Sequence, residues 1–212
     1  MDKYKETFET WNKIANLYQD KFMDLSLYDE TYDFFCNILK DNQINIFEIG
    51  CGPGNITKHL LSKKPNLKIT AIDIAPKMIE LAKANNPTAS FKVMDTRKLD
   101  EIDEKFDAIM CGFCLPYLSE TDSSKLLYDV NKLLTKDGVF YLSFINGAPS
   151  KSGYISGSTG DRTYFYYHTL EYIKNQLFKN HFKILKSFEV KYPKADDFEI
   201  HTIIIGEKIG SI

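Results

Sequence analysis

Residues 47–54 read FEIGCGPG, and the prediction of the fold depends on them most. This stretch joins a short apolar run, residues 44–49, to a helical pattern that begins at Asn55. Glycines are needed here because the chain must bend sharply between strand and helix, and because the backbone must approach a ligand without interference from a Cβ atom. The free N–H groups at the start of the following helix can bind an anion. The segment therefore predicts a ligand-binding turn after the first strand of an α/β fold.

Two details indicate which ligand this turn binds. The glycine spacing is G-x-G-x-G, and Asn55 stands where a dinucleotide-binding pattern would place its third glycine. Glu48 precedes the first glycine by two residues, and a carboxylate there suits a cationic ligand better than a phosphate. S-adenosylmethionine has an ammonium, a sulfonium and a carboxylate, so it satisfies both details. A tight turn without a ligand is the alternative.

From residue 44 onward, short apolar runs alternate with amphipathic helices. The expected strands are residues 44–49, 67–72, 90–94, 106–111 and 139–145, and the expected helices between them are 55–62, 76–84 and 122–134. Near-continuous apolar strands separated by helices indicate a parallel sheet that is covered on both faces, with right-handed crossovers. The ligand of such a sheet binds at the carboxyl ends of the strands.

The two ends of the chain differ from this core. Apolar side chains from Tyr4 to Phe22 recur at helical spacing, and a second helix is expected over residues 26–40, where it buries Tyr28, Phe35 and Leu39. We interpret this region as a cap that also covers the ligand, with a purely structural cap as the alternative.

The C-terminal third predicts a different arrangement. Residues 146–163 are rich in Gly and Ser and predict a loop that acts as a lid. Thr169 is expected to cap a helix, and residues 182–192 and 198–207 predict an antiparallel hairpin at one edge of the sheet. The chain is thus expected to form a single domain, with a cap over 1–42, a cofactor-binding core over 43–145, and a substrate loop, helix and hairpin over 146–212.

Two further acids follow strands of the predicted sheet. Asp73 lies 19 residues beyond Gly54, where a carboxylate can accept both hydroxyls of an adenosine ribose. Asp95 follows the third strand and could accept from the adenine amino group, while Met78 could pack on the adenine ring. The structural alternatives are a helix-dipole acid for Asp73, a turn residue for Asp95 and a core residue for Met78.

Taken in order, five segments carry a family resemblance: FEIGCGPGN, AIDIAPKMIELAK, FKVMDTRKL, KFDAIMCGFCLPYL and LLTKDGVFYLSF. They resemble successive motifs of the class I, Rossmann-like, S-adenosylmethionine-dependent methyltransferases of the small-molecule type. The resemblance implies a seven-stranded sheet with an antiparallel last strand. It also implies cofactor-binding roles for Tyr18, Glu48, Gly50, Gly52, Gly54, Asp73, Asp95, Thr96 and Cys111. Together with Met78 and two adjacent motif residues, Cys51 and Ile74, these residues form the predicted cofactor site.

The general base is the least defined part of this prediction. Where many relatives place a His after the fourth strand, this chain has Leu115-Pro116. The candidates for proton transfer are His168, Tyr166 and Tyr117, although a structural role is the alternative for each. The cysteines and the remaining histidines show no metal-ligand spacing, so no metal site is expected.

The composition narrows the partners. Formal net charge is −2 and the pI is about 6.1, which disfavours nucleic acid. No apolar run approaches the ~20 residues that span a bilayer, and no signal-peptide stretch is present, so we expect a cytoplasmic protein that is not membrane-bound. A monomer and a homodimer are both compatible with the sequence.

The sequence therefore predicts methyl transfer to a small molecule by in-line displacement. Two other classes stay open. One is a binding protein for S-adenosylmethionine or a nucleotide that does no catalysis. The other is an NAD(P)-dependent oxidoreductase, which Glu48, Asn55 and the C-terminal hairpin disfavour.

Overall fold

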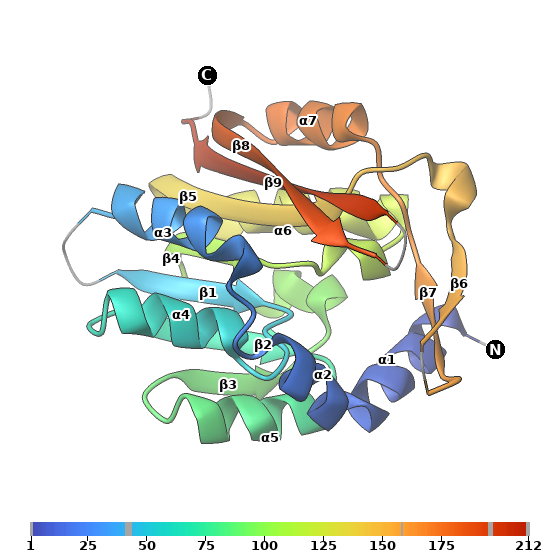
Figure 1. Ribbon diagram of the computed structural model, residues 1–212. Helices are drawn as coiled ribbons and strands as arrows, with labels where there is room; N and C mark the ends of the chain where they lie inside the picture. Colours follow the sequence, from blue (N-terminus) through green and yellow to red (C-terminus); the bar gives the residue numbers. More distant parts are fainter. Residues whose placement is uncertain (1, 41–43, 158, 195–196, 211–212) are drawn as a thin grey trace.

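A seven-stranded sheet forms the centre of the molecule, in a computed structural model that describes residues 2–40, 44–157, 159–194 and 197–210. The strand order is β3-β2-β1-β4-β5-β9-β8, and the first five strands in this order run parallel (Figure 1). β9 is antiparallel to both of its neighbours, β5 and β8. The strands are β1 (Asn45–Ile49), β2 (Lys68–Asp73), β3 (Ser90–Val93), β4 (Phe106–Cys111), β5 (Leu134–Ile145), β8 (Phe182–Pro193) and β9 (Phe198–Lys208). The predicted fold class, including the antiparallel hairpin at the edge of the sheet, is confirmed.

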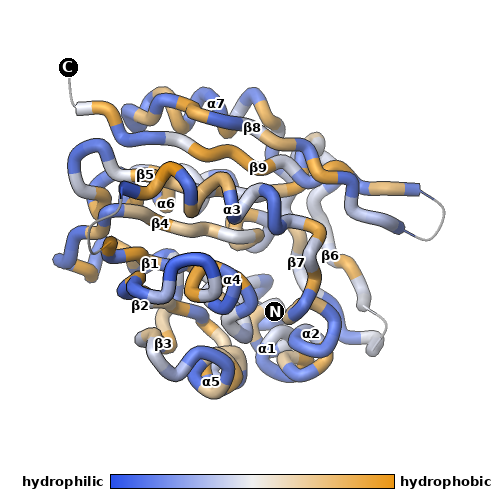
Figure 2. Tube along the Cα trace, turned by 60° about the vertical axis from the view of Figure 1, so that its left-hand side comes forward, coloured by the Kyte–Doolittle hydropathy of each residue, from blue (hydrophilic) through white to orange (hydrophobic). Residues whose placement is uncertain are grey.

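Helices cover both faces of this sheet, because its central strands are apolar on both sides. One face packs against α3 (Asp29–Ile38), α4 (Asn55–Lys63) and α5 (Pro76–Asn85). The other face packs against α6 (Glu120–Leu133) and α7 (Leu170–Lys179). Each helix buries one side and exposes the other, and Figure 2 shows the resulting alternation of hydrophobic and hydrophilic residues along α4. In the described part of the chain, no helix is both long and apolar enough to span a bilayer.

The N-terminal region forms more elements than its sequence pattern indicates. The helix expected from Tyr4 to Phe22 is divided into α1 (Lys3–Lys13) and α2 (Ala15–Phe22), because Ile14 leaves helical geometry with φ −96° and ψ 15°. A short 3₁₀ turn, η1 (Ser26–Tyr28), precedes α3. Two more such turns follow strands β3 and β4, namely η2 (Thr96–Glu101) and η3 (Leu115–Tyr117).

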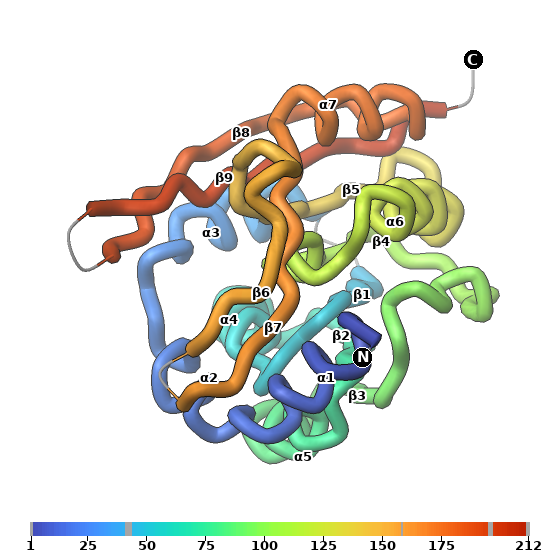
Figure 3. Tube along the Cα trace, turned by 90° about the vertical axis from the view of Figure 1, so that its right-hand side faces the viewer, coloured from blue at the N-terminus to red at the C-terminus, as the bar shows by residue number. Residues whose placement is uncertain are grey.

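The Gly- and Ser-rich segment is not the loop that its composition predicts. After a 3₁₀ turn, η4 (Pro149–Lys151), it forms a two-stranded antiparallel hairpin of β6 (Gly153–Ser156) and β7 (Arg162–Phe165). The hairpin lies along α1 (Figure 3). Two buried threonines of α1 hold it there: the Thr10 hydroxyl donates to Arg162 O at 2.9 Å, and the Tyr164 N–H donates to Thr7 Oγ1 at 2.9 Å. Composition indicated a loop, whereas the segment forms paired strands that are hydrogen-bonded to a helix distant in the sequence.

Candidate functional site

The turn after β1 is built from three glycines with left-handed backbone geometry. Gly50, Gly52 and Gly54 have φ of +69°, +53° and +83°, a region that favours glycine. The Gly50 and Cys51 N–H groups both donate to Ile72 O, at 2.8 and 3.0 Å, so the turn is tied to the end of β2. A Cβ atom at Gly54 would lie 2.4 Å from Asn86 Nδ2. The glycines therefore allow a close approach of the turn to α5 and leave its other side open.

Glu48 lies at the end of β1, directly under this turn. Its side chain faces α4, where the Thr57 hydroxyl donates to Oε2. Its other oxygen, Oε1, is buried and has no hydrogen-bond partner within the described structure. Burial raises the pKa of this carboxyl from 4.5 to about 8, and the Thr57 hydrogen bond offsets part of that rise. A buried acid with a free acceptor is costly to keep, so a cation beside it would be stabilised.

Asp73, the last residue of β2, closes the next part of the site. Its Oδ2 accepts from the Gly52 N–H at 3.0 Å, and its Oδ1 accepts from the Ala75 N–H at 2.9 Å. Each carboxylate oxygen has a second lone pair for a ligand. Burial raises the pKa of Asp73, and the backbone N–H groups that it accepts from limit the rise. Asp73 therefore has the helix-start role, and its free lone pairs are compatible with the predicted ligand role.

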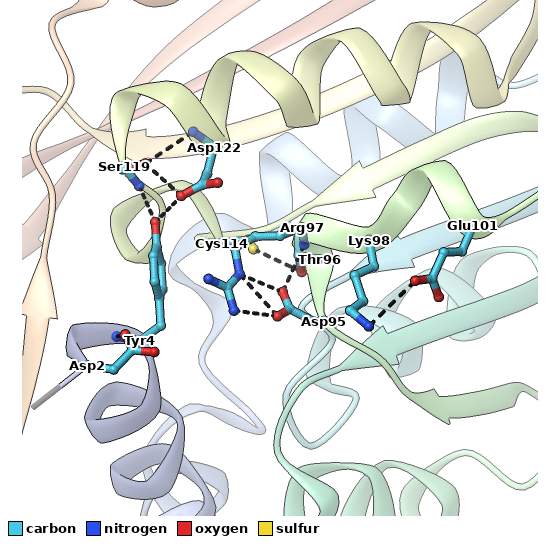
Figure 4. A network of polar contacts seen from close by, with 10 residues as sticks. All are labelled: Asp2, Tyr4, Asp95, Thr96, Arg97, Lys98, Glu101, Cys114, Ser119 and Asp122. Carbon is cyan, nitrogen blue, oxygen red and sulfur yellow. Dashed lines mark hydrogen bonds and ion pairs between the residues drawn. The ribbon is translucent and has the colours of Figure 1, made fainter.

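Asp95 follows β3 and forms an ion pair with Arg97. The Arg97 guanidinium donates to both carboxylate oxygens, with the shortest contact at 2.6 Å from the terminal nitrogen to Oδ2 (Figure 4). Burial opposes ionisation of Asp95, but these hydrogen bonds outweigh it and hold its pKa below the ordinary value. The Arg97 guanidinium also lies 4.1 Å from the centre of the Tyr4 ring. Asp95 thus stays ionised at the side of the site that α1 covers.

Tyr4 joins α1 to the start of α6, as Figure 4 shows. The Tyr4 hydroxyl donates to Asp122 Oδ2 and accepts from the Ser119 N–H at 2.9 Å. The Ser119 hydroxyl donates to the same carboxylate oxygen at 2.6 Å. These contacts hold the first turn of α1 against the core, so the N-terminal cap forms one wall of the site.

Two cavities open at the carboxyl ends of the parallel strands. The smaller, of about 110 Å³, lies over the glycine turn and beside Asp73 and Asp95. The larger, of about 670 Å³, lies under α1, α2 and the β6–β7 hairpin. Both cavities are lined by the same small group of residues, which forms their junction: Trp11, Tyr18, Gly50, Gly112, Phe113 and Tyr117. Two ligands bound in the two cavities would therefore meet at this aromatic junction.

The smaller cavity brings together most of the predicted cofactor residues. It is lined by Tyr18, Gly50, Gly52, Asp73, Ile74, Met78, Asp95 and Thr96. Cys51 lines the larger cavity. Glu48 and Gly54 line neither one among the described residues: Glu48 is 1% exposed beneath the turn, and Gly54 caps α4.

Cys111, which was predicted to line the pocket, lines neither of these two cavities in the described part of the chain. β4 continues through Cys111, so its side chain is fully buried in the core. The chain leaves the sheet one residue later, and the cavity wall at this strand is made by Gly112, Phe113 and Cys114.

The three candidates for proton transfer separate in the structure. Tyr117 lines both cavities. His168 is buried, and its Nε2 faces the carbonyl oxygens of Leu115 and Leu118 at 3.3 and 3.1 Å. Tyr166 packs against Tyr4 and Tyr164. Neither His168 nor Tyr166 lines either of these two cavities in the described part of the chain, so of the three candidates Tyr117 lies nearest to the junction.

Sequence reasoning did not include Tyr28, Tyr192 and His201 in the site. All three line the larger cavity, at its wall between η1 and the β8–β9 hairpin. A signal was available, because Tyr28 belongs to the N-terminal aromatic pattern and His201 interrupts an apolar strand. That pattern did not indicate which face of β9 would contact the N-terminal cap.

Comparison with known proteins gives a consistent assignment. Residues 46–138 match a family model described as "Methyltransferase domain". A malonyl-[acyl-carrier protein] O-methyltransferase from Acetivibrio thermocellus is 30% identical over 167 residues, which cover 76% of this chain and 56% of that protein. The chain spans about half the length of the first curated relatives that it matches.

Solved structures share the whole fold. Magnesium protoporphyrin IX methyltransferase from Synechocystis, with bound SAM, aligns with a TM-score of 0.74 at 15% identity and covers 98% of both chains. The 1,6-didemethyltoxoflavin-N1-methyltransferase of Burkholderia thailandensis, with bound substrate and S-adenosylhomocysteine, aligns with a TM-score of 0.73 at 18% identity, covering 97% of this chain and 88% of that one. Residues 46–138 are thus similar to a methyltransferase domain, and the chain has the same fold as these two methyltransferases.

Proposed function

We propose that this chain is an S-adenosylmethionine-dependent methyltransferase that methylates a small molecule. The observation that carries the proposal is Glu48 Oε1, a buried acceptor without a partner in the described structure, beneath a glycine turn whose residues Gly50 and Gly52 line the smaller cavity. A cationic amino group is the ligand that this atom would accept from, and S-adenosylmethionine has one. The bound SAM and S-adenosylhomocysteine of the two aligned methyltransferases support the same ligand.

The residues of the smaller cavity fit the other parts of the cofactor. The glycine turn and the start of α4 present N–H groups to a carboxylate. Asp73 would hold the ribose hydroxyls, Met78 would pack against the adenine ring, and Asp95 and Thr96 would bind its amino group. The Asp95–Arg97 ion pair keeps that acceptor ionised and in place.

Catalysis in this site consists mainly of positioning. The bound sulfonium supplies an activated methyl group with a good leaving group. The aromatic junction between the cavities would hold the acceptor in line with it, and such orientation can contribute ~7–11 kcal/mol. Residues of α1, α2 and the β6–β7 hairpin line the larger cavity, and they would limit the access of water to the reacting groups. On this view residues 43–145 hold the cofactor, while residues 1–42 and 146–212 bind the acceptor, which we propose as their division of roles.

Two alternatives are tested by the same experiment. An NAD(P)-dependent oxidoreductase would place a pyrophosphate beside Glu48, which is electrostatically unfavourable. A binding protein without catalysis would bind S-adenosylmethionine and never release its demethylated product. We expect calorimetry to show binding of S-adenosylhomocysteine and no binding of NADH, and we expect turnover with a metabolite panel. Absence of S-adenosylhomocysteine binding would overturn the proposal, whereas binding without turnover would favour the non-catalytic alternative.

A further inference from the structure

Three polar side chains in the wall of the larger cavity form one hydrogen-bonded chain. Tyr28 Oη lies 2.7 Å from His201 Nδ1, and His201 Nε2 lies 3.3 Å from Glu199 Oε2. All three residues line the cavity, although Tyr28 comes from η1 and the other two come from β9. The proposed cofactor and acceptor roles described above do not use these three hydrogen-bonded residues.

His201, the middle residue of the three, packs between aromatic rings. The Tyr192 ring is parallel to the His201 ring within 5° at a centroid distance of 4.9 Å, and the Tyr28 ring is parallel within 2° at 6.0 Å. The Phe113 ring lies 4.9 Å away at 58°. Since Phe113 also lines the cofactor cavity, the histidine lies one ring away from the junction.

The direction of the hydrogen bonds follows from the charges. Burial raises the pKa of Tyr28, so its hydroxyl keeps its proton and donates to Nδ1. Burial lowers the pKa of His201, although the Glu199 hydrogen bond opposes this change, so the imidazole is neutral. Its Nε2–H then donates to the Glu199 carboxylate. The titratable groups that face His201 are Tyr28 from η1, Tyr192 and Lys194 from the β8 side, and Glu199 from its own strand.

Such an arrangement can move a proton away from the cavity. A neutral imidazole that accepts at Nδ1 can take the Tyr28 proton, and the resulting imidazolium is stabilised by the carboxylate at Nε2–H. Glu199 is the exposed end of the chain, since its side chain is 24% exposed and it pairs with Lys194 at 3.1 Å. The proton therefore has a route from the buried hydroxyl toward the surface.

A proton relay is useful only to an acceptor that must lose a proton. Carboxylic acids and aryl thiols are largely ionised at about pH 8, whereas phenols and alcohols are not. The cavity wall is rich in aromatic side chains, with Phe113, Tyr117, Phe165 and Tyr167 among them, and about 670 Å³ is the size of a site for a ring-containing small molecule. Aromatic walls favour flat rings.

We propose that Tyr28, His201 and Glu199 relay the proton from the acceptor, and that the acceptor is a ring-bearing molecule methylated on a hydroxyl oxygen. This inference rests on the proposed methyltransferase function. The acceptor oxygen forms a bond to the methyl carbon as the carbon–sulfur bond of the sulfonium breaks, and that electron pair stays on sulfur. The hydroxyl proton passes to Tyr28 Oη, and the Tyr28 proton passes to His201 Nδ1. The product is a methyl ether, and the proton leaves later by way of Glu199.

The test uses two probes of nearly equal shape, naphthol and thionaphthol. The thiol is largely ionised at about pH 8 and needs no base, whereas naphthol is largely protonated. We expect Tyr28→Phe and His201→Gln to lower the turnover of naphthol by ~10²–10⁴-fold, and Glu199→Gln to lower it by about tenfold or more. Turnover of thionaphthol should stay within about threefold of the wild-type rate in every variant.

A matched control removes a buried tyrosine hydroxyl outside both cavities. Tyr141 is buried on β5, and its hydroxyl lies 2.9 Å from Thr31 Oγ1. Tyr141→Phe should leave the ratio of the two turnover rates unchanged. All variants are compared by their affinity for S-adenosylhomocysteine, which verifies that the cofactor site is folded.

Each outcome is decisive. Equal losses for both probes would show that the three residues only shape the cavity, and no loss for naphthol would remove them from proton transfer; either result overturns the relay. If wild-type protein binds S-adenosylhomocysteine but methylates neither probe, or only the thiol, the hydroxyl-acceptor proposal fails alone. If it does not bind S-adenosylhomocysteine, the proposed function itself fails.

Discussion

Replacing Glu48 with Gln should make the free protein more stable and the cofactor site weaker. Folding buries this carboxyl beneath the glycine turn, where its Oε1 has no partner within the described structure and its pKa rises from 4.5 to about 8. A glutamine has nearly the same shape, carries no charge at any pH, and can still accept from the Thr57 hydroxyl through its amide oxygen.

The pH dependence of this effect has a definite sign. Between pH 4.5 and about 8 the folded chain holds the Glu48 proton and the unfolded chain has released it. The folded state then binds more protons, so the free energy of unfolding falls as the pH rises through this range and levels off above it. Glu48→Gln removes this loss. The variant and the wild type should therefore differ little near pH 4.5 and most at pH 8 or above.

The magnitude follows from the pKa change. One pKa unit corresponds to about 1.4 kcal/mol, so a rise from 4.5 to about 8 sets an upper bound of about 5 kcal/mol. Because the amide NH₂ of the glutamine takes the place of an oxygen without a partner, we expect a gain of about 2–4 kcal/mol at pH 8. For a chain of this length that is a rise in Tm of roughly 4–16 °C.

The assay is urea unfolding of wild type and Glu48→Gln across this pH range, paired with calorimetric titration of S-adenosylhomocysteine. We expect affinity to fall by at least about tenfold, because the buried partner of the ammonium has lost its charge. Thr57→Val is a matched control, since it removes the hydroxyl partner but leaves the carboxylate. A Glu48→Gln variant that is no more stable than wild type at pH 8, or whose stability difference does not depend on pH, would refute the reasoning.

Three further predictions follow from single contacts. Gly54→Ala should lower the free energy of unfolding by roughly 1–3 kcal/mol in thermal or urea unfolding, since a Cβ there would meet Asn86 Nδ2 at 2.4 Å and φ is +83°. Gly160→Ala is the control: φ is also positive there, but the space around its Cβ position is open, so the loss of stability should be smaller. Trp11 is the one tryptophan of the chain and lines both cavities, so its emission should change on addition of S-adenosylhomocysteine, and an unchanged spectrum at saturating ligand would contradict the assigned cavity. His168→Gln should lower stability by about 1–2 kcal/mol and leave the pH profile of turnover unchanged, since its Nε2 contacts only backbone carbonyls among the described residues; a shifted profile would restore it as a base.

The core of this protein follows from local features of its sequence. Apolar runs of strand length, helical patterns between them and the glycine turn at Gly50 are local properties, so they fixed the parallel sheet and the position of the site at its carboxyl ends. Glu48, Asp73 and Asp95 were found in the same way, because the carboxyl ends of neighbouring parallel strands must lie together.

The surroundings of that core depend on tertiary packing. The β6–β7 hairpin is hydrogen-bonded to α1 through Thr7 and Thr10, which lie about 150 residues away in the sequence, and Cys111, the last residue of β4, turns its side chain into the core and not toward either cavity. Tyr28 and His201 are 173 residues apart, yet their side chains hydrogen-bond at 2.7 Å. Contacts over such sequence distances depend on how whole elements pack against each other, and side-chain periodicity carries no record of that packing.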